Sequence, residues 1–282
     1  MYCPWRAYNG CPLPRRMPSR LLPLPYMKAL RKLLVGALGF ERYIRLASYA
    51  YLRLVAAGWG RSKYPELFFL EKLVRPGDVC LDIGANLGYY SVALSRLVGA
   101  QGKVLAVEPV PLFQHIWQDN VRLSGHDNLL LLPYALGGQN DTVRMGTPAR
   151  NGLLHHGMTK VADSAPTEEY AQFYEVPMRV PDELLADFDR LDFVKCDVEG
   201  FEYEVFRHMQ HTLRRHRPLI QTELNGLDNR RRVAELLAGL GYRPYVLETQ
   251  GGPPRLVPCP PAVLSGPADR DFYFQPDAEP AS

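Results

Sequence analysis

The sequence lacks paired cysteines, which argues against a secreted, disulfide-stabilised protein. Its five cysteines are odd in number and scattered, and none forms a Cys-x-x-Cys motif. Cys80 and Cys196 fall inside predicted buried strands, so we expect both to be reduced residues of the core. From this cysteine usage we predict a cytoplasmic location.

The sequence also lacks an apolar run long enough to cross a membrane, which takes about 20 consecutive apolar residues. The most apolar stretch near the beginning, residues 33–57, is interrupted by Glu41, Arg42, Arg45 and Arg53. No apolar segment follows the first basic residues, so we expect no signal peptide. We therefore predict no transmembrane segment.

Acidic residues are scarce in residues 1–63, which carry twelve Lys and Arg side chains and the single acid Glu41. The rest of the chain carries 21 basic and 29 acidic side chains. This asymmetry predicts a basic extension, residues 1–63, attached to a separate domain, residues 64–282, rather than a protein that coats nucleic acid. We therefore predict that nucleic acid is not a partner.

The basic extension has two parts. Residues 1–25 are rich in proline and arginine and lack periodicity, which is typical of disorder; alternatively, translation starts at Met17 or Met27. Residues 27–38 and 40–57 predict two helices separated at Gly39. The second helix has one apolar stripe, made of Phe40, Tyr43, Ile44, Ala47, Tyr51, Leu54 and Val55. We favour a helical cap that packs on the following domain, and the alternative is a basic amphipathic helix on a membrane surface.

The chain is organised around residues 78–90. Residues 79–83 predict a buried strand, Gly84, Asn86 and Gly88 predict a turn, and the residues that follow have helical apolar spacing. Such a turn lets a backbone approach a nucleotide-like ligand closely. The spacing Asp-x-Gly-x-Asn-x-Gly differs from the Gly-x-Gly-x-x-Gly of dinucleotide enzymes. S-adenosylmethionine has no phosphate but has an ammonium group, and Asp82 is placed to bind that group.

Residues at the ends of the next two strands complete the predicted cofactor site. Residues 103–107 form a strand that ends at Glu108, which we expect to accept hydrogen bonds from both ribose hydroxyls. Tyr134 and Ala135 lie at the end of the third strand, residues 128–134, where we predict an adenine pocket. Ordinary strand-end packing is the alternative for these two residues, and a plain βαβ unit with packing glycines is the alternative for the whole motif.

Residues 139–180 interrupt the alternation of strands and helices. Short strand-like pieces at 142–145 and 176–180 flank a polar loop, and long irregular segments near strand ends often hold substrate. His155 and His156 lie in this loop. Either is a candidate general base, and solvated loop histidines are the alternative.

The other predicted elements define the fold class. We predict helices at residues 64–73, 90–98, 112–123, 182–188, 201–216 and 228–240, strands at 191–197, 218–223, 242–248 and 271–275, a turn at 135–138 and a proline-rich loop at 251–268. The last two strands have little helix between them, which suits an antiparallel hairpin. The sequence therefore predicts an α/β, Rossmann-like class I methyltransferase fold: a mostly parallel seven-stranded sheet with a terminal antiparallel hairpin, preceded by a helical extension.

Polar side chains collect where two neighbouring central strands end. Because side chains alternate along a strand, Lys195 and Asp197 share a face, and a buried lysine needs a partner such as Asp197 or Glu223. Lys195, Asp197, Glu199 and Glu223 are the catalytic candidates, with Asp197 as base or substrate anchor. The alternatives are a helix N-cap for Asp197 and a first-turn contact with the helix dipole for Glu199.

Three segments carry a resemblance to a known family. Residues 82–90, the dipeptide Glu108-Pro109 and residues 194–202 together resemble FkbM-type methyltransferases, over roughly residues 66–275. The resemblance implies S-adenosylmethionine-dependent methylation, usually at a hydroxyl of a sugar, polyketide or other secondary metabolite. The alternatives are a sensor or recruitment module that binds the cofactor without catalysis, and an N-methyltransferase.

A metal-dependent mechanism is a further alternative. Asp197, Glu223 and Asn225 offer oxygen ligands for Mg²⁺. This arrangement is similar to that of metal-dependent catechol-type O-methyltransferases, but the order of the residues differs. We therefore favour a site without a metal.

Overall fold

The computed structural model describes residues 31, 33–150, 153–154, 156–162, 169–266 and 270–277. The described residues fall into two compact units, with the boundary between Gly60 and Arg61. In the first unit, residues 33–38 are helical and helix α2 (Phe40–Ala56) follows. Gly39 between them has a φ of 78°, a left-handed conformation that glycine adopts readily. The predicted break at Gly39 is confirmed, whereas the predictions for residues 1–25 lie outside the described residues.

The role of the first unit stays a prediction, both as a cap and as a membrane-surface helix. In the part of the chain that the structure describes, no helix is both long enough and apolar enough to span a membrane.

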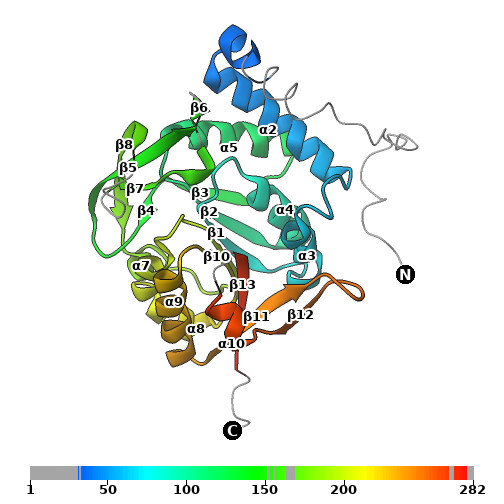
Figure 1. Cartoon of the computed structure of the whole chain (residues 1–282), viewed down its shortest axis with the longest axis vertical. Coiled ribbons are helices and arrows are strands. Elements are labelled where there is room, and N and C mark those ends of the chain that lie inside the picture. Colours follow the sequence, from blue (N-terminus) through cyan, green and yellow to red (C-terminus); the bar gives the residue numbers. More distant parts are fainter. Residues whose placement is uncertain are drawn as a thin grey trace. The chain divides into compact units, whose positions relative to one another are not determined.

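The second unit contains a large sheet, shown in the centre of Figure 1. Its described strands are eight, in the order β12-β11-β13-β10-β9-β1-β2-β3. Their bounds are β1 (Val79–Ile83), β2 (Lys103–Val107), β3 (Leu129–Leu132), β9 (Phe193–Cys196), β10 (Leu219–Leu224), β11 (Tyr242–Glu248), β12 (Arg255–Pro258) and β13 (Arg270–Pro276). β3, β2, β1, β9 and β10 are parallel, and β13 runs antiparallel between β10 and β11. The predicted class I methyltransferase fold, with a mostly parallel sheet and an antiparallel end, is confirmed.

The described sheet has one strand more than the seven predicted. β12 lies within the segment predicted as a proline-rich loop, and it pairs with β11 from Tyr245↔Pro258 to Glu248↔Arg255. Proline is tolerated on an edge strand because the missing N–H breaks no ladder bond there. A short helix, α10 (Pro261–Leu264), follows it.

The insert after β3 forms a second sheet, in which the two predicted strand pieces are parts of longer strands. Its strands are β4 (Ala135–Leu136), β5 (Asp141–Arg150), β6 (Leu153–Leu154), β7 (Lys160–Val161) and β8 (Tyr170–Arg179). β5 and β8 pair antiparallel over most of their length, and the strand pieces predicted at 142–145 and 176–180 are parts of them. β4 occupies half of the predicted turn at 135–138. Gly146, Pro148 and Pro177 interrupt the strand pattern in the sequence, which is why the pattern alone missed these long strands.

The other described α-helices of the second unit are α3 (Pro65–Leu73), α4 (Tyr89–Val98), α5 (Pro111–Ser124), α6 (Pro181–Leu184), α7 (Glu202–Arg207), α8 (Gln210–His216) and α9 (Leu227–Gly239). The single helix predicted over residues 201–216 is therefore two. The cause is Asp182, whose carboxylate accepts hydrogen bonds from the backbone N–H groups of His211 (3.0 Å) and Thr212 (2.8 Å). A carboxylate from another helix thus caps the first turn of α8 and starts a new helix there.

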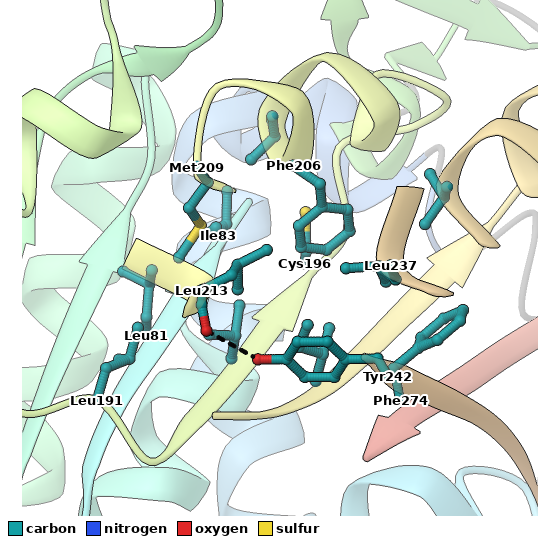
Figure 2. Packing of buried hydrophobic residues seen from close by; sticks show 14 of the residues in the cluster. Leu81, Ile83, Leu191, Cys196, Phe206, Met209, Leu213, Leu237, Tyr242 and Phe274 are labelled. Atoms are coloured by element: carbon teal, nitrogen blue, oxygen red, sulfur yellow. Dashed lines mark hydrogen bonds between the residues drawn. The ribbon is translucent and has the colours of Figure 1, made fainter. Parts of the chain in front are cut away.

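The hydrophobic core lies on the face of the large sheet that α7, α8 and α9 cover (Figure 1). Figure 2 shows this core from nearby: Leu81, Ile83 and Cys196 from the strands face Phe206, Leu213 and Leu237 from the helices. The Tyr242 hydroxyl donates a hydrogen bond to the Leu213 carbonyl at 3.3 Å, so its polar end is satisfied. Cys80 and Cys196 are free and fully buried, as predicted.

Candidate active site

The glycine turn between β1 and α4 is held against its neighbours on both sides. The N–H groups of Gly84 and Ala85 both donate to the Val107 carbonyl of β2, at 3.0 Å. On the other side, a Cβ atom at Gly84 would lie 1.9 Å from the backbone oxygen of Asp197. Gly84 and Gly88 have φ values of 80° and 87°, which side chains rarely adopt. The turn therefore lies between the end of β2 and the residue that follows β9.

The close approach at Gly84 gives a testable result. We expect Gly84→Ala to lower the free energy of unfolding by about 3–5 kcal/mol, because the methyl group meets a carbonyl and the residue is strained at positive φ. Gly77 is the matched control: it has a φ of 88° but nothing within 4 Å of its Cβ position. Gly77→Ala should cost only the backbone strain, about 1–2 kcal/mol. Urea unfolding measures both, and equal losses for the two variants would contradict the close contact.

Glu108 lies beside the glycine turn and is tied to it. Its Oε2 accepts a hydrogen bond from the Asn86 N–H, and its Oε1 accepts one from the Val110 N–H, each at 2.8 Å. The side chain is buried, and burial raises the pKa of Glu108 to about 7 although these hydrogen bonds oppose the shift. A carboxylate oxygen can accept more than one hydrogen bond, so the arrangement leaves acceptor capacity for a ligand hydroxyl.

Asp82 lies below the turn. It is only 2% exposed, and its Oδ2 accepts a hydrogen bond from the Ser91 hydroxyl at 2.5 Å. Ser91 in turn accepts one from the Trp117 indole at 2.8 Å. Burial raises the pKa of Asp82 to about 6, opposed by the Ser91 hydrogen bond and the charge of Lys195. A direct contact between Asp82 and a ligand ammonium stays a prediction.

A buried polar row crosses the face of the sheet opposite the hydrophobic core. Lys195 of β9 pairs in register with Asp82 of β1 and Gln221 of β10, so these three side chains share a face. Lys195 is 2% exposed, and its Nζ lies 3.3 Å from Asp197 Oδ2. The predicted contact between Lys195 and Asp197 is confirmed. Burial lowers the pKa of Lys195, but the neighbouring carboxylates raise it more, so its pKa is well above the ordinary value.

Sequence reasoning missed the second carboxylate at this lysine. Asp271 Oδ1, from the last strand, lies 3.8 Å from Lys195 Nζ. Asp271 also accepts a hydrogen bond from Gln221 Nε2 at 3.0 Å, and it pairs in register with Glu223 of β10. The signal in the sequence was an acid at the start of a predicted strand. Asp271 comes close to Lys195 only because β13 lies next to β10, and the sequence pattern did not specify this strand order.

Asp197 is held in place at the carboxyl end of β9. Its N–H donates to the Ile83 carbonyl at 3.0 Å, and its Oδ2 contacts Lys195. Among the described residues, its buried Oδ1 has no hydrogen-bond partner. The helix α7 begins only at Glu202, so the alternative of Asp197 as a helix N-cap is wrong. An unsatisfied carboxylate oxygen at this edge can accept a proton or a hydrogen bond from a ligand.

Glu199 lies in a conformation that the sequence pattern missed. It has a φ of 54° and lies outside the first turn of α7, so the proposed dipole contact is wrong. Its Oε2 accepts a hydrogen bond from Asn225 Nδ2 at 3.3 Å. Burial and the charges of Asp197 and Glu223 raise the pKa of Glu199 to about 8. Burial and the charge of Asp197 raise that of Glu223 to about 7.

Glu202 holds this strained turn, and sequence reasoning missed it too. Its side chain is fully buried, and its Oε1 accepts hydrogen bonds from the N–H groups of Val198 (3.0 Å) and Gly200 (3.1 Å). Its Oε2 accepts one from Asn229 Nδ2 at 2.6 Å. Glu202 therefore holds the backbone N–H groups of the residues immediately before and after Glu199. Strained backbone that is held in this way is common at functional sites.

The raised pKa of Glu199 predicts a pH-dependent stability. Between about pH 4.5 and pH 8 the folded state keeps a proton on Glu199 that the unfolded state has lost, so its contribution to stability falls as the pH rises. Glu199→Gln removes this dependence. As the pH rises through this range, we expect the Tm of Glu199→Gln to increase by about 1–4 °C relative to the Tm of the parent protein at the same pH. This expected increase is small because the Glu199 side chain is partly exposed and water weakens the effect. Thermal melts test this, with the exposed Glu235→Gln as control; parallel Tm curves for Glu199→Gln and the parent would contradict the shift.

The other predicted residues are less well placed or are not described. Tyr134 lies under the Arg179 guanidinium, 5.0 Å from the ring centre, and Ala135 is buried in β4, where it pairs with Met178. Their adenine-binding role stays a prediction. His155 lies outside the described residues, and of His156 only the backbone is described, at the start of a 3₁₀ helix (His156–Met158).

The ligand set predicted for Mg²⁺ consists of the carboxylates of Asp197 and Glu223 and the side-chain amide of Asn225. No group of three or more His, Cys, Asp or Glu side chains in the described part of the chain is arranged to hold a metal ion. The side-chain nitrogen of Asn225 donates a hydrogen bond to Glu199. The Mg²⁺ alternative is therefore left to the chelation experiment described below.

Comparison with known proteins identifies the family. The model of the FkbM methyltransferase domain matches residues 82–244, more than half of the 282-residue chain. The chain belongs to the FkbM methyltransferase family. The match includes the glycine turn, Glu108 and the Asp197 segment, so the family predicted from these motifs is confirmed. Asp271 lies beyond the matched residues.

The FkbM chain is also similar to other methyltransferases over shorter segments. It is 32% identical over 56 residues to protein-L-isoaspartate O-methyltransferase of Methanopyrus kandleri, covering 20% of this chain and 25% of that protein. It is 36% identical over 76 residues to ribosomal RNA large subunit methyltransferase E of Chromobacterium violaceum, covering 25% and 35%. The chain thus matches only a quarter to a third of the length of these curated relatives.

A similar solved structure is that of an S-adenosylmethionine-dependent O-methyltransferase from Thermotoga maritima. It has a TM-score of 0.43 and 13% sequence identity, and the similarity covers 77% of this chain and 67% of that one.

Proposed function

We propose that the protein transfers a methyl group from S-adenosylmethionine to a hydroxyl group of a sugar, glycan or secondary metabolite. The observation that carries the proposal is Asp197: its Oδ1 has no partner among the described residues, and its backbone touches the glycine turn at Gly84. Family membership supports the cofactor, because the matched segment contains the whole turn. The geometry supports a base next to the place where the methyl group is presented.

The cofactor is proposed to lie across the glycine turn. Glu108 flanks the turn on the β2 side and Asp197 flanks it on the β9 side. The ribose hydroxyls would bind Glu108, and the methionine portion would extend toward Asp197, with Asp82 below. Tyr134 and Ala135, after β3, would line the adenine site. Gly84, Asn86 and Gly88 allow the close approach of the backbone.

Methyl transfer requires the protein to position the two reactants and to accept one proton. Bound S-adenosylmethionine supplies the methyl group from its sulfonium, and positioning accounts for most of the rate in such a displacement. Asp197 accepts the proton of the acceptor hydroxyl as the oxygen–methyl bond forms and the carbon–sulfur bond breaks. Lys195 holds Asp197 through one oxygen, and the other, buried oxygen has no hydrogen-bond partner among the described residues. Glu199 and Glu223, with raised pKa values, are proposed to hydrogen-bond the acceptor.

The chemical class of the methyl acceptor is the more specific part of the proposal. One similar protein is named for ribosomal RNA and another for protein, so the predicted absence of a nucleic-acid partner stays a prediction. The cytoplasmic location also stays a prediction. The proposal of a hydroxyl acceptor depends on the family resemblance and on a carboxylate that can take a hydroxyl proton.

Transfer of labelled methyl groups tests this function. The full-length protein is incubated with S-adenosylmethionine, tritiated on its methyl group, and with the small-molecule, RNA and protein fractions of an extract from the source organism. We expect label in the small-molecule or glycan fraction, stable to mild alkali as a methyl ether is. Label in RNA, or alkali-labile label in protein, would contradict the acceptor class. Cofactor binding without label in any fraction would favour a sensor.

A further inference from the structure

We propose that the Lys195 cluster makes the site selective for charge: it favours the cationic sulfonium of S-adenosylmethionine over the neutral thioether of S-adenosylhomocysteine, and Asp271 supplies part of this selectivity. We call Lys195, Asp197 and Asp271 the Lys195 cluster. The inference rests on the proposed function, because it takes the sulfonium to lie on the glycine turn beside Asp197.

The Lys195 cluster has an excess of negative charge. Two carboxylates, Asp197 at 3.3 Å and Asp271 at 3.8 Å, share one ammonium group. Lys195 can therefore neutralise only one of them, and one negative charge remains. The side chains of Lys195, Asp271 and Asp197 are 3%, 17% and 31% exposed, so water screens a charge on Asp271 poorly.

The cluster is also held rigidly. Gln221, which is fully buried, donates one hydrogen bond to Asp271 Oδ1 at 3.0 Å and another to the Tyr90 hydroxyl at 3.2 Å. The Tyr90 ring also lies 5.0 Å from Lys195 Nζ. A charge fixed by such bonds acts on a ligand without having to reorganise.

Stability alone accounts poorly for such a cluster. Burying a lysine with carboxylates costs desolvation, and replacing buried ion pairs with apolar side chains is often neutral or stabilising. The opposite face of the same sheet is apolar throughout the core described above. The polar row instead runs under α4 toward the edge where Asp197 meets Gly84. A fixed negative field at that edge would attract the sulfonium and release the neutral product.

The experiment compares the affinities of the two ligands, which needs no methyl acceptor. Calorimetry gives the Kd values for S-adenosylmethionine, S-adenosylhomocysteine and sinefungin, which carries an ammonium in place of the sulfonium. We expect the parent protein to prefer the two cationic ligands. Asp271→Asn should reduce this preference about three- to tenfold, the order expected from one poorly screened charge. S-adenosylhomocysteine affinity should change by less than about twofold, because that ligand lacks the charge at sulfur.

The control is Asp277→Asn, the same substitution close to the other end of β13, where Asp277 pairs with Arg243. It should leave the preference unchanged. If Asp271→Asn does not fold, as judged by circular dichroism, Asp197→Asn replaces it and should shift the preference in the same direction. An unchanged preference, or equal losses for neutral and cationic ligands, would overturn the inference. A parent protein that binds none of the three ligands would instead overturn the proposed function.

Discussion

We expect the Asp197→Asn protein to turn over its acceptor about 10²–10⁴-fold more slowly than the parent, the usual contribution of a positioned base. Asparagine keeps the shape of the side chain but cannot take the hydroxyl proton. The substitution should have a small effect on folding, because Asp197 is not a helix cap and its backbone N–H bond to Ile83 remains. S-adenosylhomocysteine should bind nearly normally, because Glu108 and the glycine turn are untouched. Turnover is measured with the acceptor fraction that the labelling experiment identifies.

The same assay separates the remaining mechanisms. Asp189→Asn, at a fully exposed side chain, is the matched control and should be as active as the parent. If Asp197 held Mg²⁺, EDTA would abolish the parent activity and Mg²⁺ would restore it, whereas we expect EDTA to have no effect. A fully active Asp197→Asn enzyme would remove Asp197 from the mechanism.

Glu108→Ala should weaken S-adenosylhomocysteine binding by about 1–3 kcal/mol, the cost of leaving polar partners unpaired. The Glu108 carboxylate is placed to accept the ribose hydroxyls, and it also holds the N–H groups of Asn86 and Val110. Its loss therefore removes a ligand contact and loosens the turn. Isothermal calorimetry measures the affinity, and the exposed Glu235→Ala is the control. Unchanged affinity in Glu108→Ala would show that the ribose lies elsewhere.

The sequence predicted the parts of the site that depend on local chemistry. The glycine turn, the acid after β2 and the pairing of Lys195 with Asp197 follow from strand alternation and from residue types close together in the chain. Each of these features lies in a short segment, and the residues of that segment determine its local structure. The family follows from the same segments.

The missed features depend on contacts between distant segments. Asp271 reaches Lys195 only because β13 inserts next to β10, and Glu202 orders its turn together with Asn229 of α9. Asp182 divides the predicted helix by capping α8 from another helix. In the insert after β3, prolines and a glycine interrupt the strand pattern of the sequence, so the pattern did not predict the full length of the paired strands β5 and β8. No local pattern contains such information, because each case requires knowing which segments lie together.

The central claim, a site built for S-adenosylmethionine on the glycine turn, is tested most directly by calorimetric titration of the parent protein with S-adenosylhomocysteine and with NAD. The turn has the spacing of a ligand without a pyrophosphate, and Glu108 is already tied to its backbone. We predict saturable binding of one S-adenosylhomocysteine per chain and no heat of binding with NAD. Tight binding of NAD, or no binding of S-adenosylhomocysteine to folded protein, would contradict the claim.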